Sequence, residues 1–156
     1  MAITSAICNS FKTEILTATH NFTNSTGNTF KLALYSSDSA TLSKSTTAYT
    51  APSDGTADPT NTYEVTSTSS GYTTGGNSLT STTPALSGDT ACCLFASTSW
   101  GSTASFTARG CLIYNSNASN KAVCVVNFGA DKTVTTGTFT VEFPAQTAGN
   151  AIIQIA

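Results

Sequence analysis

The sequence predicts a mainly β protein, a single-domain β-sandwich of about eight or nine strands with one N-terminal α-helix. A third of the chain, 52 of its 156 residues, is Ser or Thr. Thr favours strands and Ser favours turns. Short apolar runs rich in β-branched and aromatic residues recur along the chain and are separated by turn residues. The length suits one domain that covers residues 1–156.

The clearest strand pattern lies between residues 104 and 143. Three apolar runs there are separated by two blocks of turn residues, 115–120 and 129–137. This arrangement predicts a meander of three antiparallel strands. The first strand is apolar on both faces and is therefore expected to be central in its sheet. Arg109 lies in that strand, so it is expected to be mostly buried and to have a carboxylate or carbonyl partner.

The one good helix candidate covers residues 3–18. Ile3, Ile7, Phe11 and Ile15 recur every four residues and form an apolar stripe. The stripe is expected to pack on the sheet, or alternatively to dock on a partner subunit.

The other strands follow in order. Apolar residues alternate over 29–36, which predicts the first strand. Residues 37–62 are polar and have weak periodicity, so this span is expected to be an extended loop or arm. We expect the arm to be flexible in a free monomer and ordered against neighbouring subunits. The remaining strands of the sandwich are predicted within 63–156.

The five cysteines are expected to be small buried hydrophobic residues with reduced thiols. Their number is odd, and nearly all have apolar neighbours; they are Cys8, Cys92, Cys93, Cys111 and Cys124. A disulfide between Cys111 and Cys124 is the alternative. No metal site is expected, because the chain has no C-x-x-C pair and His20 is its only histidine.

Charge and composition exclude several classes of function. The net charge is −2, and the six Lys and Arg residues are scattered, so no nucleic-acid partner is expected. No apolar run approaches the ~20 residues of a membrane helix, and no signal peptide is apparent. The eight acidic residues form no recognisable catalytic pair or triad, so neither an enzyme nor a cofactor is expected.

Several segments resemble small virion proteins of tailed bacteriophages, whose genes lie among head and tail structural genes. The matching segments read GYTTGG at 71–76, TARGCLIYN at 107–115, KAVCVVNFGADK at 121–132 and GTFTVEF at 137–143. The opening AITSAICNSFKTEIL also resembles that family. The resemblance covers nearly the whole chain except 37–62. Its motifs are structural, so it implies no active site.

This resemblance implies a non-enzymatic structural component of the virion, assembled in the host cytoplasm. A capsid decoration or cement protein is favoured over a tail, neck or baseplate component. The implied partners are the major capsid protein or other virion proteins, and copies of the chain itself. The alternative is a receptor- or glycan-binding module whose loop aromatic residues stack on sugar rings. The candidate interface residues are Ile3, Ile7, Phe11, Tyr49, Tyr72 and Trp100.

Overall fold

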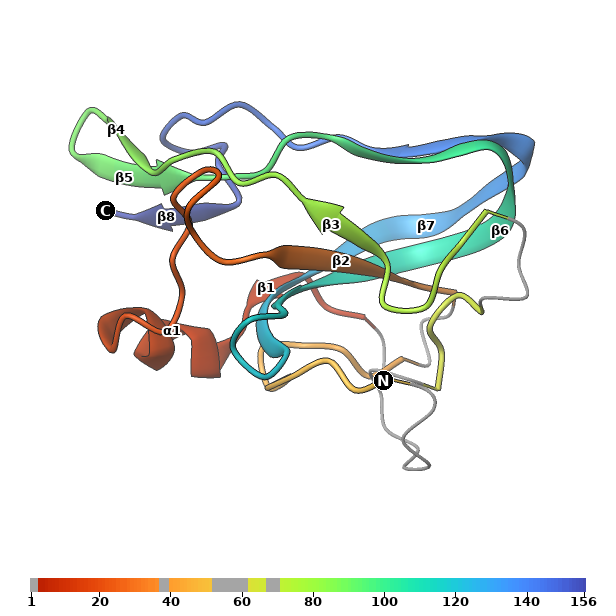
Figure 1. The fold of residues 1–156 in the computed structure, drawn as a ribbon, viewed down its shortest axis with the longest axis horizontal. Coiled ribbons are helices and arrows are strands. Elements are labelled where there is room, and N and C mark those ends of the chain that lie inside the picture. Colours follow the sequence, from red (N-terminus) through yellow and green to blue (C-terminus); the bar gives the residue numbers. More distant parts are fainter. Residues whose placement is uncertain (1–2, 37–39, 52–61, 67–70) are drawn as a thin grey trace.

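The computed structural model describes residues 3–36, 40–51, 62–66 and 71–156 (Figure 1). The protein is mainly β, with 47% strand and 6% helix. In chain order the elements are β1 (Ala6–Ile7), α1 (Asn9–Leu16), β2 (Phe30–Tyr35), β3 (Asn77–Leu79), β4 (Ala85–Ser87), β5 (Thr90–Cys93), β6 (Thr98–Asn115), β7 (Lys121–Val141) and β8 (Ile153–Ile155). Within the described ranges, no helix is long and apolar enough to cross a membrane.

The strands form two antiparallel sheets. The larger sheet has the order β1-β7-β6-β2-β3, and the smaller one has the order β4-β5-β8. In Figure 1 the long β6–β7 ribbon runs along the top of the molecule, turns at the right end and returns below. The same two strands therefore pass through both levels of the fold, and the arrangement is sandwich-like. As expected, β6 is central, because it lies between β7 and β2.

The hydrophobic core joins residues of both sheets, of α1 and of the connecting segments. The second half of β6 is buried on both faces, as its apolar sequence predicts. Gly110 in this half has no room for a side chain, since an added Cβ would lie 2.6 Å from the carbonyl oxygen of Val126 and 3.0 Å from Cγ2 of Ile3. Close packing of backbone and N-terminal segment therefore requires glycine at this position.

The predicted three-stranded meander is wrong in its second connection. The turn at 116–120 forms as expected, but residues 129–137 lie inside β7. Gly129 and Thr136 have positive φ angles of 79° and 46°, and the β6–β7 register shifts repeatedly along this stretch. The turn-forming residues therefore produce irregular, bulged pairing rather than a chain reversal. The predicted third strand is the last part of β7.

The predicted helix over 3–18 is also too long. Only Asn9–Leu16 is helical, and Ala6–Ile7 forms β1, which pairs with Val125 and Cys124 of β7. A repeat of four residues fits one face of a helix, but it also fits one face of a strand, whose period is two. The N-terminal segment satisfies its backbone groups against the sheet edge, so β1 and not 29–36 is the first strand.

The span 37–62 is not an arm throughout. In its described part, 40–51, Ala40 and Leu42 are fully buried. The Leu42 carbonyl accepts a hydrogen bond of 2.9 Å from the Thr4 N–H, and the Tyr49 N–H donates one of 2.8 Å to the Asn120 carbonyl. The expectation of a flexible arm is therefore wrong for 40–51. Residues 37–39 and 52–61 lie outside the described part of the chain.

Candidate functional site

Five of the six candidate interface residues are buried inside the chain itself. Ile3, Phe11, Tyr49, Tyr72 and Trp100 all belong to the hydrophobic core, and Ile7 packs against it. The aromatic side chains of Tyr49, Tyr72 and Trp100, which the sequence predicted to be exposed in loops, are therefore buried. Trp100 lies in β6, where it is paired with Phe139, and not in a loop.

Tyr49 and Tyr72 converge on a buried carboxylate that sequence reasoning missed. Glu64 is 4% exposed. Its Oε2 accepts a hydrogen bond of 2.9 Å from the Tyr49 hydroxyl, and its Oε1 accepts bonds from the Tyr72 hydroxyl at 2.7 Å and the Gly75 N–H at 2.6 Å. Three connecting segments, 40–51, 62–66 and 71–76, are thus joined at one side chain.

The same carboxylate is enclosed by strand residues. Tyr114 of β6 stacks on Tyr49 with ring centroids 4.4 Å apart, and its hydroxyl donates to the Gly75 carbonyl at 2.8 Å. Burial raises the pKa of Glu64, although the hydrogen bonds from Tyr72, Gly75 and Tyr49 act in the opposite direction. The arrangement ties loops to the sheet, and no hydroxyl in it is activated, because burial raises the pKa of Tyr49 and of Tyr72.

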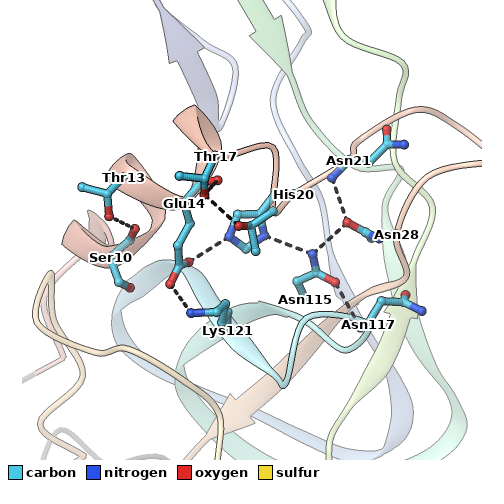
Figure 2. A network of polar contacts seen from close by, with 11 residues as sticks. Ser10, Thr13, Glu14, Thr17, His20, Asn21, Asn28, Asn115, Asn117 and Lys121 are labelled. Carbon is cyan, nitrogen blue, oxygen red and sulfur yellow. Dashed lines mark hydrogen bonds and ion pairs between the residues drawn. The ribbon is translucent and has the colours of Figure 1, made fainter.

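A second polar network lies between α1 and the β6–β7 turn (Figure 2). Glu14 of α1 accepts hydrogen bonds from Lys121 Nζ at 2.6 Å and from His20 Nε2 at 2.9 Å. Burial alone would raise the pKa of Glu14, but the hydrogen bonds from Lys121 and His20 and the charge of Lys121 outweigh it and lower that pKa.

The direction of every hydrogen bond around His20 follows from two backbone donors. The Asn117 N–H bonds Asn115 Oδ1 at 3.1 Å, so the Asn115 amide nitrogen faces His20 Nδ1 and Asn28 Oδ1, both at 3.0 Å. Asn28 Oδ1 also accepts the Asn21 N–H at 2.8 Å. His20 Nδ1 is therefore an acceptor, and the proton lies on Nε2, directed at Glu14.

The His20 network is structural in form. A general base needs a nucleophile or substrate proton within hydrogen-bond reach, but both ring nitrogens are already engaged by Glu14 and Asn115. The ring is also packed against Phe11, with centroids 4.9 Å apart. The histidine therefore joins α1, the following loop and the end of β6. In the part of the chain that the structure describes, no group of three His, Cys, Asp or Glu side chains could hold a metal ion.

A polar hollow lies beside the loop that follows His20. Its volume is about 250 Å³, and one wall is the loop 23–29 while the other is the segment 79–81. Ser81 lines this hollow and is 6% exposed, and its hydroxyl has no hydrogen-bond partner within the described residues. In a chain so rich in Ser and Thr, no sequence signal distinguishes this hydroxyl from the others.

The cysteines are buried as expected. All five are free thiols in the structure. Burial raises the pKa of Cys111 to about 12 and that of Cys93 to about 11, so these thiols have little thiolate character. Arg109 has the expected carboxylate partner, with Nη1 at 3.6 Å from Oδ1 of Asp131. Its side chain is mostly buried, as expected, with 22% of its surface exposed, whereas Asp131 lies at the surface.

Comparisons with protein-family models, with curated protein sequences and with solved structures gave no match.

Proposed function

We propose that this protein is a non-enzymatic structural component of a tailed phage particle, specifically a decoration or cement protein of the capsid. In this proposal the two sheets are the layers of a β-sandwich, and the partners are the major capsid protein and copies of the chain. The four segments that resemble phage virion proteins support this choice. The observation that carries it is an apolar row that crosses the smaller sheet.

The row consists of Leu86, Ala91 and Ile155. Ala91 of β5 pairs with Leu86 of β4 on one side and with Ile155 of β8 on the other. Directly paired residues in antiparallel strands have their side chains on the same face. Leu86 is 75% exposed and Ile155 is 59% exposed, so this face of the sheet presents large apolar side chains to the surroundings.

The same face continues into the core. Cys93 and Ile153 lie two residues further along β5 and β8, are paired with each other and are buried. One face of the small sheet therefore has two parts. Its residues Cys93 and Ile153 lie in the core, and the apolar row next to them lies outside it. β4 and β8 are the edge strands of this sheet among the described residues, so backbone groups are also open to pairing. Such a surface suits protein–protein contacts.

The internal polar groups support a structural role over a catalytic one. Glu64 joins connecting segments to one another and Glu14 joins a helix to a turn, as described above, so both carboxylates serve to hold segments together. The binding module with stacking loop aromatics loses its support, because Tyr49, Tyr72 and Trp100 are buried. With charged residues at only 9%, the surface also has little long-range repulsion against neighbouring subunits.

Incorporation of variants into particles tests the proposal. Leu86→Ser combined with Ile155→Ser should fold with a stability within about 0.5 kcal/mol of wild type, because both side chains are exposed. The double variant should nevertheless be depleted from gradient-purified particles. Leu16→Ser is the matched control, since Leu16 is 85% exposed on α1, and it should be incorporated normally. Equal incorporation of the double variant and wild type would contradict the role of the apolar row.

A further inference from the structure

Strand β7 borders an open side of the fold. Its first part lies in the lower level of Figure 1, and its last part returns in the upper level. Beyond Val125, β7 pairs only with β6 among the described residues. The outer edge of its last part, 139–141, therefore has no strand partner in the described part of the chain.

Two hollows lie along β7. One has a volume of about 370 Å³ and is lined by Phe128, Lys132 and residues 139–142. The other has a volume of about 340 Å³ and is lined by residues 5–7, 124–126 and Ile152. Both are lined by large apolar side chains that pack against the core and are only partly buried: Ile7, Val126, Phe128, Val141 and Ile152. The hollows therefore leave apolar surface uncovered.

The two hollows are neighbours. Phe128, in the first part of β7, contacts Phe139, near its end, with ring centroids 6.4 Å apart, so the first hollow lies where the two parts of the strand face each other. Val126, in the second hollow, precedes Phe128 by two residues, which places the two side chains on one face of β7 roughly 7 Å apart. Alternate side chains of an extended peptide have the same spacing, so one such peptide can fill both hollows.

The open edge beside the first hollow is regular. Residues 139–141 pair one to one with 98–100 of β6, and every register shift of the β6–β7 pair lies beyond Trp100. Alternate residues of an antiparallel strand direct both their N–H and C=O groups away from the paired neighbour. Backbone donors and acceptors next to the hollow are therefore directed outward, and the bulges that protect such edges are placed elsewhere in β7.

The rim of the first hollow has one charge of each sign. Lys132 and Glu142 both line it and are exposed, and neither forms an ion pair within the described residues. A matching segment therefore has a basic and an acidic residue on the outer side of this hollow and apolar residues inside it.

A second copy of the chain does not supply such a segment from its described residues. The large apolar side chains exposed there are Leu16, Leu86 and Ile155. No two of them are two residues apart, so none can place side chains in both hollows at once. The pattern of the groove is therefore complementary to another protein.

We propose that this side of the fold binds an extended segment of a different protein, which adds a strand beside residues 139–141. Backbone hydrogen bonds to the open edge provide affinity, and two apolar side chains at positions i and i+2 enter the hollows and provide specificity. This surface is separate from the apolar row of the small sheet, so the inference does not depend on the decoration role.

The test is a titration of the ¹⁵N-labelled protein with capped peptides. The sequences TVTIKTE and ETKITVT present the same apolar and charged pattern in the two chain directions. At least one of them should shift the amides of 126–128 and 139–142 saturably and slow hydrogen exchange of outward-directed amides in 139–141. Replacing both apolar residues of that peptide with Ser should weaken binding at least tenfold, because the hollows are then left unfilled.

Two pairs of protein variants locate the binding site. Phe128→Ala should weaken binding by about tenfold, whereas Phe143→Ala, which removes another partly buried aromatic side chain that lines neither hollow, should not. Lys132→Glu should weaken binding severalfold, whereas Lys44→Glu, at an exposed position away from the groove, should not. A peptide with Gln in place of its Glu should lose the dependence on Lys132.

Several results would overturn the proposal. They are the absence of any saturable shift with both peptides, equal binding of the Ser-substituted peptide, or binding that slows no amide exchange in 139–141. Shifts of the same amides with protein concentration alone would overturn it in favour of a second copy. A saturable response to octanoate but to neither peptide would overturn it in favour of a free alkyl chain.

Discussion

At the scale of single residues, the buried carboxylate of Glu64 and the partly buried carboxylate of Glu14 have opposite environments. Glu64 is bonded by hydroxyl and backbone donors, and burial raises its pKa. Glu14 is bonded by Lys121 and His20, which lower its pKa. A raised pKa in the folded state means that folding favours the protonated form, whereas a lowered pKa means that folding favours the ionised form. The two groups therefore affect stability in different pH windows.

Replacing Glu64 with Gln should remove the pH dependence of stability that comes from the raised pKa of Glu64. The contribution of Glu64 is fully present below its unfolded-state pKa, near 4.5, and is lost as the pH rises through the raised folded-state pKa. The stability of Glu64→Gln relative to wild type should therefore improve as the pH rises through this window. Gln can still accept from Tyr72 and Gly75, and Tyr49 can turn to accept from its amide. Urea denaturation between pH 4 and pH 8 measures the difference.

Two further variants control this experiment. Glu14→Gln should show the opposite sign, because the contribution of Glu14 is present above pH 4.5 and is lost as the pH falls through its lowered pKa, so the urea denaturation series of this variant extends below pH 4. Glu64→Ala should lose roughly 3 kcal/mol or more at every pH, since it leaves three buried donors without an acceptor. A pH-independent difference between Glu64→Gln and wild type would show that the carboxylate is not buried.

The proton of His20 gives a direct check on the second network. The hydrogen-bond directions set by Asn115 and Asn117 require a neutral ring protonated at Nε2. Long-range ¹H–¹⁵N correlation spectra at neutral pH should show an Nε2–H tautomer, and Asn115→Asp should disturb it. A ring protonated at Nδ1 would mean that the Asn115 amide is turned the other way and that the network is assembled differently.

At the scale of elements, the β6–β7 ribbon determines the fold, and part of it could be predicted. The central position of β6 follows from apolar residues on both faces, and β2 follows from the alternation at Phe30, Leu32 and Leu34. The continuation of β7 through 129–137 could not be predicted, because Gly129 and Gly137 signal a turn and a bulge equally well. Only the pairing with β6, a tertiary contact, decides between them.

The N-terminal segment and Glu64 show the same limit. The spacing of Ile3 and Ile7 fits a helix or a strand, and in the structure Ile7 lies in β1, which pairs with β7 at the edge of the sheet. Glu64 follows the polar span 37–62, and its partners Tyr49, Tyr72 and Gly75 lie in other segments of the chain. Glu64 is buried because three connecting segments meet around it, and this tertiary arrangement cannot be predicted from a local sequence pattern.

The crowded position inside β6 provides the test at this scale. Gly110→Ala should destabilise the protein by about 1–3 kcal/mol, because its Cβ would meet the Val126 carbonyl oxygen at 2.6 Å and Ile3 at 3.0 Å. Gly101→Ala, in the same strand but with open space around the new Cβ, should be neutral or slightly stabilising. Chemical denaturation of both variants gives the comparison. Equal stability of the two would contradict the close packing of Ile3 on β6.

At the scale of the whole molecule, the fold combines a well-tied interior with a weakly charged surface. The described connections are joined to the sheets through Glu64 and the His20 network, and all five thiols are buried. The apolar row Leu86–Ala91–Ile155 is the part of this surface that extends the core outward. These properties suit a rigid subunit that packs against other proteins in a particle.

The most direct measurement of this account is the copy number of the protein in purified phage particles, by quantitative mass spectrometry with isotope-labelled peptides. A capsid decoration protein should be present in numbers comparable with those of the major capsid protein, and the Leu86→Ser/Ile155→Ser variant should reduce that ratio while Leu16→Ser does not. A copy number far below that of the capsid protein would contradict decoration and indicate the tail or neck. Absence from intact particles would contradict a virion role altogether.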